Sequence, residues 1–169
     1  LGSDSSASLD ALEGAASTMR LVARDTDSST LVPALEQAFS NARTAIANQS
    51  RADLSVQTAV MRGGLQRAHQ EAAQDSGNID GARPGFSQLA AELDLDAATL
   101  DSMASATNLQ ALLKHYQAGL ARSIAGQLET VQSQFPGSQA DAYITLADAY
   151  GRSLSLQDAP EAPAELNDG

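Results

Sequence analysis

Histidine is the residue type in this chain best suited to acid–base or metal chemistry, and the sequence holds two, His69 and His115. Neither has a second His at ligand spacing, and the chain has no Cys. A metal site needs several convergent ligands, and a catalytic His needs an orienting or reacting partner. The sequence therefore predicts that both are polar surface or boundary residues, and that the chain holds no metal and no cofactor.

The stretch around His69 is nevertheless similar to the phosphorylated helix of histidine phosphotransfer domains. Those domains are also small acidic helical bundles, and residues 65–69 (LQRAH) have a comparable local pattern. They usually carry a Lys three residues after the His, followed by Gly, whereas this chain has Ala72 and Ala73. That cation would stabilise a phosphoimidazole, and this chain lacks it. Phosphotransfer through His69 is therefore a weaker alternative than the two functions proposed at the end of this section.

Oxygen-bearing side chains gather at residues 76–81 (SGNIDG), which resemble the first half of an EF-hand loop with Gly in sixth position. The ninth position of such a loop falls on Pro84, and the twelfth falls on Ser87. An EF-hand needs a bidentate Glu at the twelfth position. The segment is therefore predicted to be a turn-rich loop without a metal.

The sequence contains no motif for nucleophilic catalysis or nucleotide binding. There is no Gly-x-Ser-x-Gly elbow, no phosphate-binding Gly-rich loop followed by Lys, and no dinucleotide fingerprint. Tyr116, Tyr143 and Tyr150 lie at helical spacings and are predicted to be core or core-edge residues. The sequence nominates no catalytic residue and favours a protein that is not an enzyme.

Composition excludes several classes of protein. The 169 residues include 10 Lys and Arg against 21 Asp and Glu, a formal net charge of −11. Aromatic residues make up only 4% of the chain, whereas nucleic-acid platforms need clustered cations and stacking rings. The absence of Cys excludes a disulfide scaffold. The chain also lacks the run of about 18 apolar residues that spans a bilayer.

Apolar residues recur at spacings of three and four along most of the chain, which predicts amphipathic helices. The first run covers residues 8–24, and residues 30–75 form either one long helix or two with a kink near 48–51. Gly63 and Gly64 lie inside this run. They predict either a kink or a place where another helix backbone comes close.

Residues 75–87 are dense in Asn, Asp, Gly and Pro without an apolar period, which predicts a loop. Two short helices follow within 86–104, and Asp94 or Asp96 is expected to cap the second.

A long helix comes next, with Thr107 and Gln110 as its capping box. It is predicted to end at Pro136. A last helix then begins at a cap near Ser138 and reaches Leu154.

These elements predict an all-α fold, because no segment alternates like a strand rich in Val, Ile and Thr. The expected architecture is a mostly antiparallel bundle of four main helices with a short helical insertion near 86–104. We expect the bundle over residues 8–155. We expect disorder in residues 1–7 and in the acidic, Pro-containing tail 156–169.

A non-catalytic protein–protein interaction module is the function favoured by these features, as in an adaptor, a secretion chaperone, a regulator or a delivered effector domain. Amphipathic helices dock in apolar grooves, so another protein is the expected partner, with a homodimer left open and nucleic acid not expected. The predicted partner-binding residues lie on the long helix and are Leu109, Leu112, Leu113, Tyr116 and Leu120.

An extracytoplasmic ligand-sensing bundle of a membrane receptor is the alternative from another class. Such bundles bind ligands between helices, often through Arg, and Arg43, Arg62 and Arg67 are candidates by residue type. No signal peptide is expected in this sequence. The lack of Cys fits the cytoplasm as well as a secreted or periplasmic location, so the compartment stays open.

Overall fold

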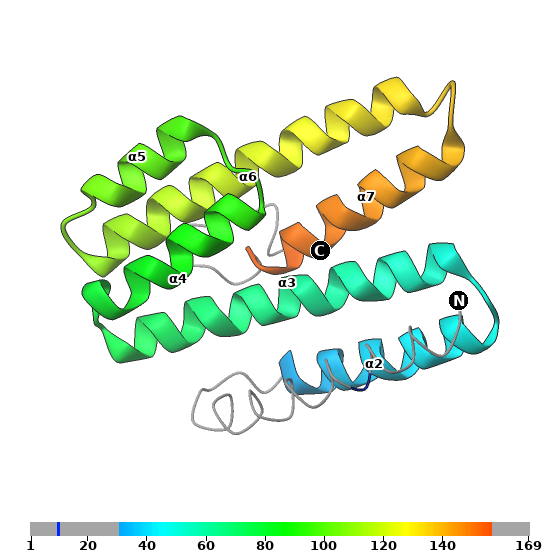
Figure 1. Cartoon of the computed structure of the whole chain (residues 1–169), viewed down its shortest axis with the longest axis horizontal. Helices are drawn as coiled ribbons and strands as arrows, with labels where there is room; N and C mark the ends of the chain where they lie inside the picture. The colour runs from blue at the N-terminus through cyan, green and yellow to red at the C-terminus, as the bar shows by residue number, and fades with distance from the viewer. Residues whose placement is uncertain (1–9, 11–30, 157–169) are drawn as a thin grey trace.

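The structure is a computed structural model, and it describes residue 10 and residues 31–156 (Figure 1). This part of the chain contains six helices and no strand, so the predicted all-α fold is confirmed. The helices are α2 (Leu31–Ala47), α3 (Arg51–Ser76), α4 (Ile79–Glu92), α5 (Ala97–Ser105), α6 (Leu109–Gln134) and α7 (Gln139–Leu154). Four of these, α2, α3, α6 and α7, are longer than the other two. The helices α4 and α5 span residues 79–105, a longer stretch than the predicted insertion near 86–104. Apart from Asp10, the predicted helix over 8–24 lies outside the described residues, as does the predicted segment 1–7.

The helices α2, α3, α7 and α6 lie side by side in that order (Figure 1). Two hairpins, α2–α3 and α6–α7, make antiparallel neighbours, while α3 and α7 run in the same direction. The shorter α4 and α5 pack against α6 at one end of the molecule, so they cover only its first half. The second half of α6 and the first half of α7 extend beyond them.

Two helices, rather than one kinked helix, occupy residues 30–75. The chain reverses over residues 48–50, where Gln49 adopts a left-handed backbone conformation with φ of 55°. The Ser50 hydroxyl then accepts a hydrogen bond from the Asp53 N–H (3.3 Å) and caps α3. The reversal coincides with the lapse in the apolar stripe that the sequence shows near 48–51.

The predicted loop over 75–87 is correct only at residues 77 and 78, because α3 reaches Ser76 and α4 begins at Ile79. The Asn78 side chain caps α4 by accepting from the N–H groups of Asp80 and Gly81. Pro84 lies inside this helix, although it lacks an N–H and disfavours a helix interior. Phe86 is fully buried in the core, and its burial offsets the poor local propensity.

Caps at the other helix starts are short-range features, and the sequence predicted most of them. The Asp96 carboxylate accepts from the Thr99 N–H (2.7 Å), and the Ser138 hydroxyl accepts from the Asp141 N–H (3.3 Å), as expected. At α6 the cap is Asn108, one residue after the predicted Thr107.

Two apolar clusters form the core of the described part. The smaller one joins α2 to α3 through Leu35, Phe39 and Met61. The larger one lies between α4, α5 and α6 and is centred on Phe86 and on α6 residues such as Tyr116. Leu156, the first residue of the predicted disordered tail, belongs to this cluster and is 1% exposed; the rest of that tail lies outside the described residues.

The two parallel helices α3 and α7 cross at glycines. A Cβ atom at Gly63 would fall on the backbone carbonyl of Gly151, 2.8 Å from its carbon. A Cβ at Gly151 would in turn lie 2.8 Å from the Ala59 Cβ, with the Ala59 backbone carbonyl closer still. Of the two alternatives predicted for Gly63, the structure therefore shows the close approach of another helix backbone.

Candidate functional site

The residues predicted to bind a partner lie in or against the core. Leu112, Leu113, Tyr116 and Leu120 are no more than 6% exposed, and Leu109 packs partly buried against the same cluster. Since α4 and α5 cover this half of α6, a partner could reach these side chains only if those helices moved away. A surface open to a partner has to lie elsewhere.

Helix α7 turns its small side chains inward and its large ones outward. Ala142, Ala147, Ala149 and Gly151 are buried, because α3 and α6 flank this helix closely. Tyr143, Leu146 and Tyr150 are 43%, 44% and 51% exposed. The predicted core or core-edge position is correct for Tyr116, which is fully buried, and wrong for Tyr143 and Tyr150.

The exposed side chains of α7 share one side of the α6–α7 hairpin with two from α6. Gln127 of α6 and Asp148 of α7 bond to each other on the opposite side (2.6 Å). Successive helical residues are rotated by about 100°, which places Leu128 and Phe135 about a quarter turn from Gln127, both in the same direction around α6. The same rotation places Tyr143, Leu146 and Tyr150 about 150° from Asp148 on α7. We call this surface the tyrosine face; its residues are Leu128, Phe135, Tyr143, Leu146 and Tyr150.

The tyrosine face is apolar and uncharged. Of the exposed large apolar residues in the described part, all except Ile144 belong to it. Between residues 123 and 147 the sequence has only two charged residues, Glu129 and Asp141, and both are acidic. The helical rotation places neither of them among the five residues of the face.

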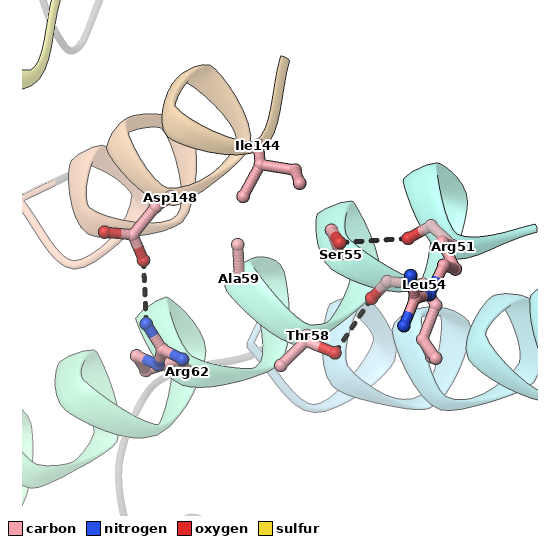
Figure 2. Close-up of a pocket in the computed structure, with 8 residues that line it drawn as sticks. All are labelled: Arg51, Leu54, Ser55, Thr58, Ala59, Arg62, Ile144 and Asp148. Atoms are coloured by element: carbon pink, nitrogen blue, oxygen red, sulfur yellow. Dashed lines mark hydrogen bonds and ion pairs between the residues drawn. The ribbon is translucent and has the colours of Figure 1, made fainter. Parts of the chain in front are cut away.

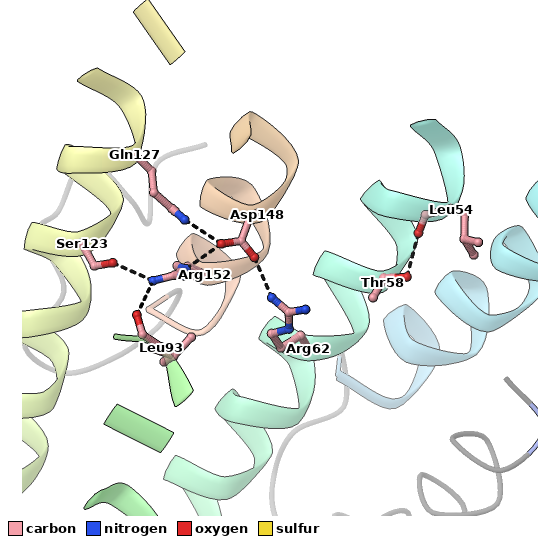
Figure 3. A network of polar contacts seen from close by, with 8 residues as sticks. All are labelled: Leu54, Thr58, Arg62, Leu93, Ser123, Gln127, Asp148 and Arg152. Carbon is pink, nitrogen blue, oxygen red and sulfur yellow. Dashed lines mark hydrogen bonds and ion pairs between the residues drawn. The ribbon is translucent and has the colours of Figure 1, made fainter. Parts of the chain in front are cut away.

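The opposite side of the hairpin carries a polar network centred on Asp148 (Figure 3). The Asp148 Oδ1 accepts from Arg62 of α3 (2.7 Å), and its Oδ2 accepts from Gln127 of α6 (2.6 Å) and from Arg152 (2.9 Å). One carboxylate thus connects three helices. The Asp148 side chain is 24% exposed, so the contacts are only partly screened by water.

Arg152 extends this network towards α4. Its Nη1 donates to the backbone carbonyl of Leu93 (3.0 Å) and to the hydroxyl of Ser123 (2.6 Å). With a side chain 12% exposed, Arg152 depends on these acceptors and on Asp148 to offset the loss of hydration.

A pocket of about 320 Å³ lies beside Arg62, between α3 and the first half of α7 (Figure 2). We call it the α3–α7 pocket. Its lining comes from α3 (Arg51, Leu54, Ser55, Thr58, Ala59 and Arg62) and from α7 (Ile144 and Asp148). The α3 residues recur at helical spacing over three turns, so they form one stripe.

Only one of the three arginines proposed as ligand contacts lies at this pocket. Arg62 lines it, whereas Arg43 of α2 pairs with Asp10 (2.8 Å) and Arg67 pairs with Glu71 (2.9 Å). Arg51, which also lines the pocket, was not predicted from the sequence. Its signal was present, because Arg51 and Arg62 are eleven residues apart and therefore lie on one side of a helix.

His69 is partly buried between α3 and α4. A Cβ at Gly85 would lie 2.7 Å from the His69 Nε2, and the imidazole packs edge-on against Phe86 with ring centroids 5.0 Å apart. Within the described part the buried Nε2 has no hydrogen-bond partner. This enclosed position lends no support to a phosphoryl transfer at Nε2. The other histidine, His115, is half-buried on α6.

The burial of His69 predicts that acid destabilises the fold. Burial lowers the pKa of His69 below its ordinary value, so the unfolded chain binds the proton more tightly than the folded chain. The contribution of neutral His69 to the free energy of unfolding is complete above about pH 6.5. It is lost as the pH falls through the lower pKa that His69 has in the folded state. Urea unfolding between about pH 8 and pH 5 should show a smaller loss of stability in His69→Gln than in the wild type. Equal losses would contradict the prediction.

The described residues contain no group of three His, Asp or Glu side chains arranged to hold a metal ion. Among the helices described here, none combines the length and the apolar character needed to cross a membrane. The fold and its surfaces define the class as an all-α helical bundle, with an apolar face and a pocket on opposite sides of α7. Neither a protein-family model, nor a curated protein, nor a solved structure matches this chain.

Proposed function

We propose that this protein is a non-catalytic protein–protein interaction module that binds an amphipathic helix of another protein on the tyrosine face. The observation that carries the proposal is the exposure of these side chains, which runs from 43% to 62%. Contiguous exposed apolar surface of this kind marks interaction sites in soluble proteins. Two of the five residues are Tyr, a type enriched at the centre of interfaces.

The shape and charge of this surface favour one kind of partner. Two adjacent antiparallel helices present ridges and a groove between them, which accept a third helix. The tyrosine face favours contact with the apolar side of a partner helix. The net charge of −11, together with Glu129 and Asp141, attracts Lys or Arg at the edges of that partner helix. A second copy brings the same negative charge and is therefore repelled. The expected partner helix is apolar on one side and basic at its edges.

The proposal predicts that the tyrosine face can be made polar without unfolding the protein. In Tyr143→Gln/Tyr150→Gln, each substitution should cost less than about 1.5 kcal/mol, because each side chain is already about half exposed. The unfolding transition measured by circular dichroism should stay cooperative. Loss of the fold in this variant would contradict the prediction, since it would show that these side chains are part of the core.

Photo-crosslinking from the face tests the partner directly. A benzophenone amino acid in place of Tyr150, in cells that make the protein, should yield an adduct with another protein. The same group at Gln110, an exposed position on the covered half of α6, serves as the control. The adduct should disappear in the background of Tyr143→Gln/Leu146→Gln.

The crosslinked segment of the partner, made as a peptide, should then bind the wild type at least about tenfold more tightly than Tyr143→Gln/Tyr150→Gln. An adduct of twice the chain mass would overturn the proposal in favour of a second copy. The absence of any adduct beyond the Gln110 control would overturn it altogether.

A ligand-sensing bundle is the second candidate, and the α3–α7 pocket is the observation that favours it. The pocket lies between helices and is lined by Arg62, as that hypothesis requires. Small molecules that bind there should raise the thermal midpoint of the wild type.

A further inference from the structure

The α3–α7 pocket exists because its two helices diverge. From their crossing at Gly63 and Gly151, α3 and α7 separate towards Arg51 and Ile144, and the pocket lies in the opening (Figures 1 and 2). Its position is therefore a consequence of the glycine crossing.

The charges at the pocket are positive on balance. Arg51 and Arg62 both line it. Among the described residues, no acidic side chain forms an ion pair with the Arg51 guanidinium. The single acid, Asp148, is already neutralised by Arg62 and by Arg152 from outside the pocket. Arg62 uses one nitrogen for this contact, and its side chain is 51% exposed, so its other donors remain open. In a chain of net charge −11, two of the ten cations meet here.

The two hydroxyl groups of the pocket already donate their protons to backbone carbonyls, so the arginine side chains are the groups that can donate to a bound anion. Ser55 donates its hydroxyl proton to the Arg51 carbonyl (2.9 Å), and Thr58 donates to the Leu54 carbonyl (2.8 Å). Both hydroxyl oxygens can therefore only accept from a ligand. An anionic head is placed best at an arginine, and an Arg fork matches a carboxylate with two parallel hydrogen bonds.

The rest of the lining is apolar and the space is small. Leu54, Ala59 and Ile144 provide hydrocarbon surface on both helices. A volume of about 320 Å³ is near the lower limit for small-molecule pockets, about 300 Å³. The space suits one ring or a short chain.

We infer that the α3–α7 pocket binds a small organic carboxylate, with its anionic head on Arg51 and its apolar body against Leu54, Ala59 and Ile144. This inference rests on the second candidate function, ligand sensing, and names its ligand class. It does not depend on the tyrosine face, which lies on the other side of α7.

Three probes with one ring and different heads test the ligand class. Benzoate, benzamide and benzylamine are titrated into the full ¹⁵N-labelled chain, and amide shifts are followed by NMR. Benzoate should shift amides of residues 51–62 and 144–148 with millimolar affinity, and the neutral and cationic probes should bind at least about tenfold more weakly.

Arg51→Gln tests the position of the head. This exposed residue has no described ion pair to lose, so the variant should keep the wild-type spectrum outside the pocket. Benzoate should bind it at least about tenfold more weakly. Arg43→Gln removes the same charge from α2, outside the pocket, and should bind benzoate as the wild type does.

The outcomes separate the ligand class from the sensing function. Binding of benzamide or benzylamine at the pocket as strong as that of benzoate would overturn the carboxylate while keeping a ligand site. Equal weakening by Arg51→Gln and Arg43→Gln would show a general charge effect and overturn the assignment of the head. The absence of pocket shifts with all three probes would overturn both the inference and the pocket as a sensing site.

Discussion

Gly63→Ala should lower the free energy of unfolding by about 3 kcal/mol or more, the upper end of what overpacking costs. The added methyl would meet the backbone carbonyl of Gly151 rather than the end of a flexible side chain. Backbone atoms cannot move aside individually, so α3 and α7 would have to separate along their length. Urea unfolding followed by circular dichroism measures the change. Gly151→Ala should have a comparable effect, because its Cβ would meet the backbone of Ala59.

Gly126 provides the matched control for this crossing. It lies inside α6, and a Cβ at this position would meet nothing within 4 Å. Gly126→Ala should therefore stabilise the protein by about 0.5–1 kcal/mol, the difference in helix propensity between the two residues. A similar response of Gly63→Ala and Gly126→Ala would show that the helices do not cross closely in solution.

Asp148→Ala should lower the free energy of unfolding by about 2 kcal/mol, less than the cost of breaking a fully buried ion pair, because the Asp148 side chain is 24% exposed. The substitution leaves Arg152 with no carboxylate although its side chain is 12% exposed. It also removes the acceptor that Arg62 and Gln127 share. Denaturant unfolding should show a lower midpoint with an unchanged slope.

Two further variants separate the loss of this network from a general effect of removing an acid. Asp101→Ala removes an exposed carboxylate from α5 and should change stability by less than about 0.5 kcal/mol. Adding Arg152→Met to Asp148→Ala removes the unpaired cation and should recover part of the loss. If Asp148→Ala matched Asp101→Ala, the network would contribute nothing measurable.

Local features of this protein could be predicted from the sequence because they depend on neighbours within one helical turn. Ser138 and Asp96 cap their helices with side chains that reach N–H groups three residues ahead. Leu35 and Phe39, four residues apart in the apolar run that predicted this helix, are both buried on α2. Where tertiary contact opposed local propensity the prediction failed, as in α4, where the burial of Phe86 outweighs Pro84.

The candidate surfaces required the tertiary structure, because burial depends on which helices become neighbours. An apolar stripe at helical spacing predicts a buried side. On α7, however, the close approach of α3 at Gly151 admits only small residues and leaves Tyr143 and Tyr150 outside. On α6 the same kind of stripe is buried at Leu112, because α4 and α5 cover the first half of that helix and not the second. The sequence by itself determined most of the helices and the caps at Asp96 and Ser138. Only the packing of α7 between α3 and α6 decided which apolar side chains stay exposed.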